Sequence, residues 1–171
     1  MIRIVIAEDQ EMLLGAIGSL LNLEEDMEVV GQASNGKEAL VLVDQMQPDI
    51  CIMDIEMPQM SGLEAAEALR SFGCKVIILT TFARSGYFGR ALQAEVSGYL
   101  LKDSPSEELA QSIRSIIDGK RIYCPELIDK ESIDNELEMD VFQPQIERQT
   151  KINTVKHYLS TFLDKIKMPT G

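Results

Sequence analysis

The stretch Ile50-Cys51-Ile52-Met53-Asp54 (ICIMD, residues 50–54) decides the fold, because it is an uninterrupted apolar run that ends in a carboxylate. Four further short apolar runs occur along the chain, at Ile2–Ala7, Glu28–Gly31, Lys75–Thr80 and Gly98–Leu101. Most of these runs are continuous rather than alternating, as expected of parallel strands that are buried on both faces.

Segments with helical spacing separate these runs. They cover residues 11–23, 35–46, 62–72, 85–94 and 104–118. Asn35 is a good N-cap for the second segment, and Ser104 with Pro105 is a typical start for the last one. Strands and helices therefore alternate five times along the chain. This alternation predicts an α/β fold, with a five-stranded parallel sheet and helices on both of its faces.

Composition and charge limit the classes of function. The 171 residues carry a net charge of -12, so the field of the whole chain repels nucleic-acid phosphates and anionic membranes. No apolar stretch approaches the roughly 20 residues that span a bilayer, and the start MIRIVIAEDQ lacks the pattern of a signal peptide. The protein is therefore expected to be cytoplasmic, with no membrane insertion. The sequence has no CxxC motif, so we expect Cys51, Cys74 and Cys124 to be free thiols, as is usual in a reducing compartment.

Polar side chains stand at the carboxyl ends of the expected strands. Glu8 and Asp9 follow the first run, Asp54 the third and Lys102 the fifth, while Thr80 ends the fourth. Because ligands of parallel sheets bind at these strand ends, the side chains are expected to meet at one rim. Clustered carboxylates with a backbone carbonyl suit Mg²⁺, and a phosphoryl group on one carboxylate needs a metal, a positive group and a hydroxyl.

Each of these residues has an ordinary structural explanation when it is taken alone. An Asp after a strand is usually a turn residue or a helix cap, a Thr in a strand is a good β former, and Lys102-Asp103 is ordinary solvated surface. Their occurrence together, at several strand ends in order, favours a functional site instead.

The residues around these strand ends resemble bacterial receiver domains of two-component response regulators. The resemblance covers about residues 1–127 and rests on Ala7-Glu8-Asp9-Gln10, Met53-Asp54-Ile55-Glu56-Met57-Pro58, Ser61-Gly62-Leu63-Glu64, Leu79-Thr80-Thr81 and Gly98-Tyr99-Leu100-Leu101-Lys102-Asp103. The last of these runs and the Thr81-Phe82-Ala83-Arg84 loop are similar, more narrowly, to the NarL/FixJ (LuxR-type) branch. The resemblance implies a flavodoxin-like sheet of order 2-1-3-4-5.

The resemblance also implies roles for the site residues. Asp54 would accept a phosphoryl group from a sensor histidine kinase, with Lys102 and Thr80 holding the phosphoryl oxygens. Mg²⁺ would be bound by Glu8, Asp9, Asp54 and the backbone carbonyl of Glu56. Thr80 and Tyr99 would form the switch pair. The Glu56 carboxylate, two residues past Asp54, is expected to orient or obstruct the attacking water and so to tune the phosphoryl lifetime.

The character of the chain changes after Gly119. We predict a receiver domain over residues 1–120, an acidic linker over 121–150 and an amphipathic helix within 151–171. That helix resembles the recognition helix of a LuxR-type DNA-binding module, with Thr154, Lys156 and His157 as possible DNA contacts. Residues 128–153 do not resemble the scaffold helices of such a module, so the module is expected to be truncated or degenerate.

Three functions remain open at this point. The first is a phosphorylation switch of the transcriptional-regulator lineage that forms a homodimer when phosphorylated. The chain also resembles regulators that are paired with membrane-fluidity-sensing kinases, which implies a response to membrane lipids. The second is a receiver that acts only through protein contacts, its tail helix packing on the receiver or on a second copy. The third, an enzyme of the haloacid-dehalogenase kind, is disfavoured because Glu56 stands where that class has a second Asp. Slow self-dephosphorylation is the only activity expected, so an enzyme is not predicted.

Overall fold

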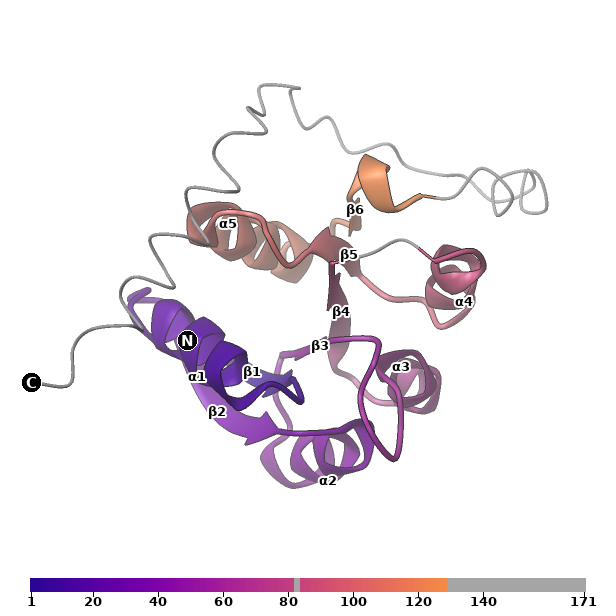
Figure 1. The fold of residues 1–171 in the computed structure, drawn as a ribbon. Helices are drawn as coiled ribbons and strands as arrows, with labels where there is room; N and C mark the ends of the chain where they lie inside the picture. Colours follow the sequence, from indigo (N-terminus) through magenta and orange to yellow (C-terminus); the bar gives the residue numbers. More distant parts are fainter. Residues whose placement is uncertain (82–83, 129–171) are drawn as a thin grey trace, which may run out of the picture.

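One parallel sheet with helices on both faces forms the body of the computed structural model, which describes residues 1–81 and 84–128 (Figure 1). The strands are β1 (Ile2–Ala7), β2 (Met27–Ala33), β3 (Ile50–Met53), β4 (Lys75–Thr80), β5 (Gly98–Leu101) and β6 (Ile122–Tyr123). The helices are α1 (Glu11–Asn22), α2 (Gly36–Met46), α3 (Gly62–Leu69), α4 (Tyr87–Gln93) and α5 (Ser106–Ile117), followed by the 3-10 turn η1 (Pro125–Leu127).

The order of the strands is β2-β1-β3-β4-β5-β6, and every pair of neighbours is parallel. The predicted α/β class and the order 2-1-3-4-5 are therefore confirmed, with one addition. The sequence predicts five strands, whereas β6 pairs with Gly98 and Tyr99 of β5 as a sixth. A strand of two residues is too short to leave a periodic pattern, which is why the sequence does not reveal it.

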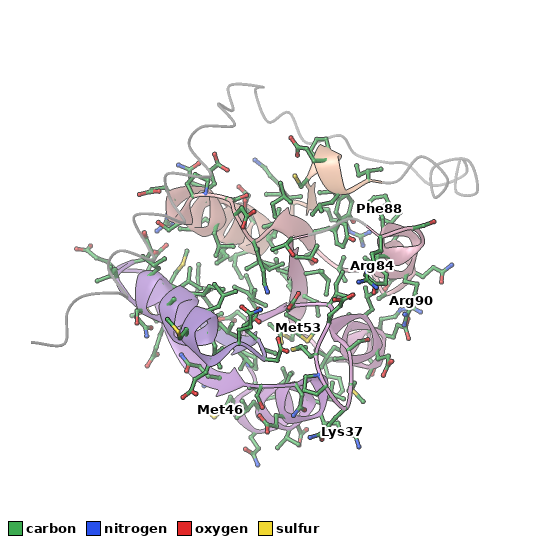
Figure 2. All side chains as sticks on the ribbon, in the orientation of Figure 1. Lys37, Met46, Met53, Arg84, Phe88 and Arg90 are labelled. Atoms are coloured by element: carbon green, nitrogen blue, oxygen red, sulfur yellow. The ribbon has the colours of Figure 1, made fainter. Side chains whose placement is uncertain are left out.

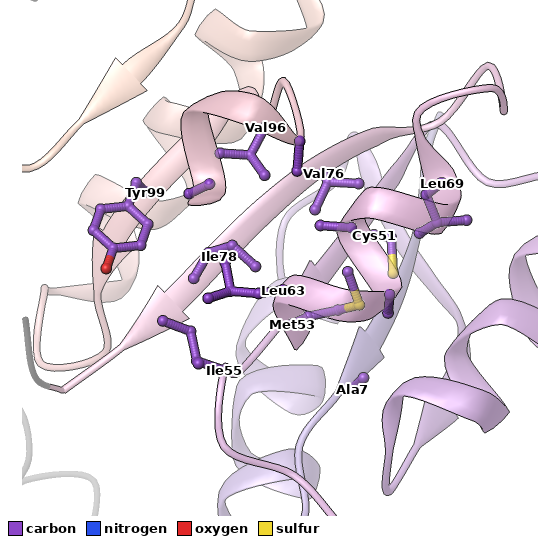
Figure 3. Close-up of a cluster of buried hydrophobic side chains, with 14 of the residues drawn as sticks. Ala7, Cys51, Met53, Ile55, Leu63, Leu69, Val76, Ile78, Val96 and Tyr99 are labelled. Atoms are coloured by element: carbon purple, nitrogen blue, oxygen red, sulfur yellow. The ribbon is translucent and has the colours of Figure 1, made fainter. Parts of the chain in front are cut away.

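The sheet divides the core into two layers because successive side chains of a strand point to opposite faces. In β1, Val5 and Ala7 face the layer covered by α2, α3 and α4, whereas Ile4 and Ile6 face the layer covered by α1 and α5. Figure 1 shows the same division of the helices, and Figure 3 shows part of the first layer around Ile78. Burial on both faces explains why the strands appear as continuous apolar runs.

Two of the five described α-helices, α2 and α3, begin at a side-chain cap. The side chains of Asn35 and Ser61 accept hydrogen bonds from backbone N–H groups at the starts of α2 and α3, at 3.0 and 3.2 Å. The predicted cap at Ser104 is wrong: α5 begins at Ser106, and Pro105 takes the cap position in an extended conformation (ψ 148°) without a side-chain hydrogen bond. The part of the chain that the structure describes contains no helix long and apolar enough to cross a membrane.

All three cysteines are free, as predicted. Cys51 is fully buried in β3, and burial raises the pKa of its thiol well above the ordinary value. Burial also raises the pKa values of Cys74 and Cys124 to about 12. These thiols are therefore poor nucleophiles at neutral pH.

Gly62 supports the loop that follows β3. Its N–H donates a hydrogen bond to the carbonyl of Ile55 at 2.9 Å, which draws the start of α3 against this loop. A Cβ atom at Gly62 would lie 1.9 Å from the backbone oxygen of Asp54. Only glycine therefore allows α3 to begin so close to Asp54.

We predict that Gly62→Ala lowers the free energy of unfolding by about 1–3 kcal/mol, because the new methyl group must push the Asp54 backbone aside. Gly15→Ala is the control, since Gly15 is exposed in α1 with nothing within 4 Å of the added Cβ. That control should raise the free energy of unfolding by about 0.5–1 kcal/mol through helix propensity. Urea unfolding followed by circular dichroism measures both changes, and equal stability of the Gly62 variant and the wild type would contradict the close approach.

Candidate functional site

The carboxyl ends of four strands meet at one rim of the sheet. Ala7 of β1 pairs with Met53 of β3, and Thr80 of β4 pairs with Leu101 of β5. Backbone hydrogen bonds continue beyond the strands, since the Asp54 N–H donates to the carbonyl of Ala7 at 3.1 Å. The residues that follow β1, β3 and β5 are therefore carried to the same place.

Lys102 lies between two acidic side chains at this rim. Its Nζ is 2.5 Å from Oε2 of Glu8 and 2.9 Å from Oδ2 of Asp54. The three side chains are only 7%, 2% and 12% exposed, respectively. The second oxygen of Asp54, Oδ1, accepts a hydrogen bond from the N–H of Ile55 at 2.7 Å. Asp54 is thus held on both sides while it stays at the edge of the sheet.

Burial and pairing act against each other on the pKa values of this group. Burial raises the pKa of Glu8, and the hydrogen bond from Lys102 only partly offsets this effect. For Lys102, burial alone would lower the pKa, but the hydrogen bonds to Glu8 and Asp54 outweigh it, so its pKa is raised. Lys102 is therefore a fixed positive charge at neutral pH.

Glu8, Asp9 and Asp54 form an acidic cluster. One carboxylate oxygen from each lies within 4.8 Å of the others. Glu8 is buried and also accepts a hydrogen bond from the Gln10 N–H, while Asp9 is exposed to solvent. An all-oxygen set that is open on one side fits Mg²⁺, which binds few carboxylates and keeps several waters.

Thr80 and Tyr99 lie on one face of the sheet. Both are buried, and Tyr99 pairs with Ile78, which is two residues before Thr80 in β4. Side chains two apart share a face, so Thr80 and Tyr99 both project toward α4. The Tyr99 ring packs against Phe88 of α4 with 5.6 Å between centroids, and Figure 3 shows this ring beside the buried core.

Glu56 has partners that the sequence does not indicate. Its Oε1 lies 3.0 Å from the guanidinium of Arg84 and accepts a hydrogen bond from the Tyr87 hydroxyl at 3.3 Å. Arg84 precedes α4 and Tyr87 is its first residue. The spacing of residues 56, 84 and 87 in the sequence does not predict this contact, because it depends on the tertiary packing of two segments that are far apart in the chain.

The predicted DNA-contact residues Thr154, Lys156 and His157 lie outside the described residues. The same holds for most of the predicted linker and for the whole predicted tail helix. The described site is therefore the rim of the sheet alone.

Comparisons with known proteins agree with this geometry. Residues 4–114 match the model of the response regulator receiver domain family. The chain is 56% identical to the transcriptional regulatory protein DesR of Bacillus subtilis (strain 168) over 182 residues, which cover 98% of this chain and 92% of DesR. It is 63% identical over 129 residues to YvfU, an uncharacterized transcriptional regulatory protein of the same organism, covering 74% of this chain and 64% of that protein.

Solved structures give the same result. The chain resembles the crystal structure of a DNA-binding response regulator of the LuxR family from Staphylococcus aureus, with a TM-score of 0.66 and 40% identity over 68% of this chain and 99% of that one. It also resembles the signal receiver domain of the putative response regulator NarL from Mycobacterium tuberculosis, with a TM-score of 0.67 and 30% identity over 70% of this chain and 98% of that one. With the strand order, the acidic cluster and the buried lysine, these matches show that the chain belongs to the response regulator receiver domain family, among the transcriptional response regulators.

Proposed function

We propose that this chain is a phosphorylation switch of a two-component system, in which Asp54 accepts a phosphoryl group from a sensor histidine kinase. The observation that carries the proposal is the buried contact of Lys102 with Asp54 and Glu8 inside an acidic cluster. A buried cation beside a partly accessible carboxylate is suited to holding a charged group that forms on that carboxylate.

The chemistry follows from the positions of these groups. An Asp54 oxygen attacks the phosphorus of a phosphohistidine, the phosphorus–nitrogen bond breaks, and the histidine leaves with its electron pair. The product is an acyl phosphate with a charge of about -2 in place of the -1 of the carboxylate, and the nearby Lys102 ammonium offsets the added charge. Glu8, Asp9, Asp54 and the Glu56 backbone carbonyl would hold Mg²⁺, which supplies further positive charge to the phosphoryl oxygens.

Thr80 and Tyr99 are proposed as the switch pair. Thr80 would turn its hydroxyl toward the phosphoryl oxygens. The Tyr99 ring already lies inward, at 0% exposure, so the turn of Thr80 would change how this ring packs rather than bring it inward. Their shared face supports the proposal, because both side chains lie on the α4 side of the sheet. Such a change would convert a new charge at the rim into a new packing arrangement beneath α4.

We expect acetyl phosphate with Mg²⁺ to label the wild-type chain once, and Asp54→Asn to abolish this labelling. Asp49→Asn is the matched control, because Asp49 precedes β3 at the opposite end of the strand and accepts a hydrogen bond from the Arg3 N–H. Intact-mass spectrometry should show the added phosphoryl group in the wild type and in the control only, and EDTA added before the acetyl phosphate should prevent labelling of both. Full labelling of the Asp54 variant would refute this assignment.

Glu56 is proposed to tune the lifetime of the phosphoryl group, since its carboxylate stands two residues past the phosphoacceptor. Glu56→Asn should change the first-order rate constant for loss of the phosphoryl group by about twofold or more. The variant loses the ion pair that holds this side chain to Arg84, and an exposed pair contributes up to about 1 kcal/mol. The decay is followed by mass spectrometry after the donor is removed. An unchanged rate would show that this carboxylate has no part in hydrolysis.

The output is proposed to be transcriptional, carried by the segment after the receiver domain. This proposal keeps the division into residues 1–120, 121–150 and 151–171, with Thr154, Lys156 and His157 as DNA contacts. A membrane-lipid signal stays a prediction from the sequence. The alternative is a receiver that acts only through protein contacts. A low-salt titration of labelled duplex DNA with the phosphorylated chain, followed by fluorescence anisotropy, decides between them: salt-sensitive binding supports the transcriptional output, and no binding supports protein contacts.

Phosphorylation is further expected to shift a monomer–dimer equilibrium. Met12 of α1 is 61% exposed and lies beside the partly buried Leu13 and Leu14, so α1 offers apolar surface to a second copy. In α5, Ile113 and Ile116 are fully buried in the core and are not accessible to a partner. Sedimentation should give a larger mass with a phosphoryl analogue than without it, and Met12→Glu should reduce this increase. Val41→Glu on α2 is the control, because Val41 is also an exposed apolar residue, and equal masses in both states would exclude the proposed dimer.

A further inference from the structure

The contacts of Glu56 join two loops across the phosphorylation rim. Glu56 belongs to the loop after β3, whereas Arg84 and Tyr87 belong to the segment after β4. Asp54 and Thr80 stand at the ends of these two neighbouring strands. The bridge from Glu56 to Arg84 and Tyr87 therefore crosses the side of the site that lies between β3 and β4.

Both described partners of Glu56 act on the same oxygen. The Arg84 guanidinium lies 3.0 Å from Oε1, and the Tyr87 hydroxyl donates to Oε1 at 3.3 Å. Two donors on one oxygen hold the carboxylate toward α4. Glu56, Arg84 and Tyr87 thus form one connected polar group, which begins two residues past the phosphoacceptor.

The Asp54 side chain is largely shielded from solvent. It is only 12% exposed, although it lies at the edge of the sheet in the position that must receive a phosphoryl group. Lys102 and Glu8 account for the inner side of this burial. On the side between β3 and β4, the Glu56 bridge connects the two loops.

We propose that Arg84, assisted by Tyr87, is a positioning residue that holds Glu56 across the phosphorylation site and thereby slows hydrolysis of the acyl phosphate. The inference rests on the proposed function of Asp54. In the hydrolysis, a water oxygen attacks phosphorus, the bond between phosphorus and the Asp54 oxygen breaks, and the water protons leave with inorganic phosphate. The Glu56 bridge limits the approach of that water and neutralises a carboxylate that would otherwise stand unpaired beside the phosphoryl oxygens.

An ion pair between α3 and α4 provides a matched control. Arg90 of α4 contacts Glu67 of α3 at 3.1 Å, with side-chain exposures of 43% and 46%. The Arg84 and Glu56 side chains are similarly exposed, at 61% and 52%. Figure 2 labels Arg84 and Arg90 on the same side of the molecule, near α4 and α3. Removal of either arginine costs one surface ion pair, but only Arg84 contacts the loop that follows Asp54.

The test compares decay rates of the phosphorylated full-length chain. After labelling with acetyl phosphate and Mg²⁺ and removal of the donor, Arg84→Ala should lose its phosphoryl group about two to five times faster than the wild type, the range that an exposed ion pair supports. Arg84→Lys should restore most of the lifetime, and Arg90→Ala should decay at the wild-type rate. Tyr87→Phe should give a smaller acceleration, because it removes one of the two donors.

A double variant separates positioning from a general structural effect. If Arg84 acts through Glu56, the chain carrying both Arg84→Ala and Glu56→Gln should decay no faster than the faster of the two single variants. Additive effects, or a wild-type rate in Arg84→Ala, would overturn the role of the bridge. Thermal unfolding of each variant should match the wild type, since both side chains are exposed.

The outcomes also separate this inference from the proposed function. Failure of the wild-type chain to take up label at Asp54 would overturn the proposed function, and the role of Arg84 with it. Normal labelling followed by equal decay rates in the wild type and in Arg84→Ala would overturn the positioning role alone.

Discussion

The contact of one shielded ammonium group with a buried and a partly buried carboxylate is the constraint on which the site depends. Glu8 and Asp54 come from different strands, and their charges would repel each other without Lys102 between them. A charge that is removed from water must be paired, because an unpaired buried ion costs several kcal/mol. The parallel register meets this requirement, because β1 and β3 end level with Ile78 of β4, and β4 and β5 end together two residues further on, just before Lys102.

This arrangement also keeps the rim negative. Lys102 balances only one of its two acidic neighbours, and Asp9 adds a further carboxylate at the solvent side. The remaining negative charge suits a divalent cation, while the fixed ammonium suits an anionic group on Asp54. The charges of these four side chains therefore suit two ligands of opposite charge.

Much of the fold and of the inner site is predictable from the sequence. The bounds of β1, β3, β4 and β5 agree with the apolar runs, and placement of Asp54 and Lys102 then follows from the common edge of parallel strands. The start of α5 is not predictable from capping statistics alone, because Pro105 adopts an extended conformation in place of the first helical turn. The partners of Glu56 are not predictable either, since a contact between two loops far apart in the sequence depends on tertiary packing.

The short strand β6 has a consequence for association at the edge of the sheet. An exposed edge strand offers unpaired N–H and C=O groups to which another chain can add. Here β5 is paired at Gly98 and Tyr99 by β6, and the Cys124 N–H donates to the Tyr99 carbonyl at 2.7 Å. The edge that remains belongs to a strand of only two residues, followed directly by the turn η1. This edge of the sheet therefore offers another chain few backbone groups to pair with, in contrast to the opposite edge, where β2 is seven residues long.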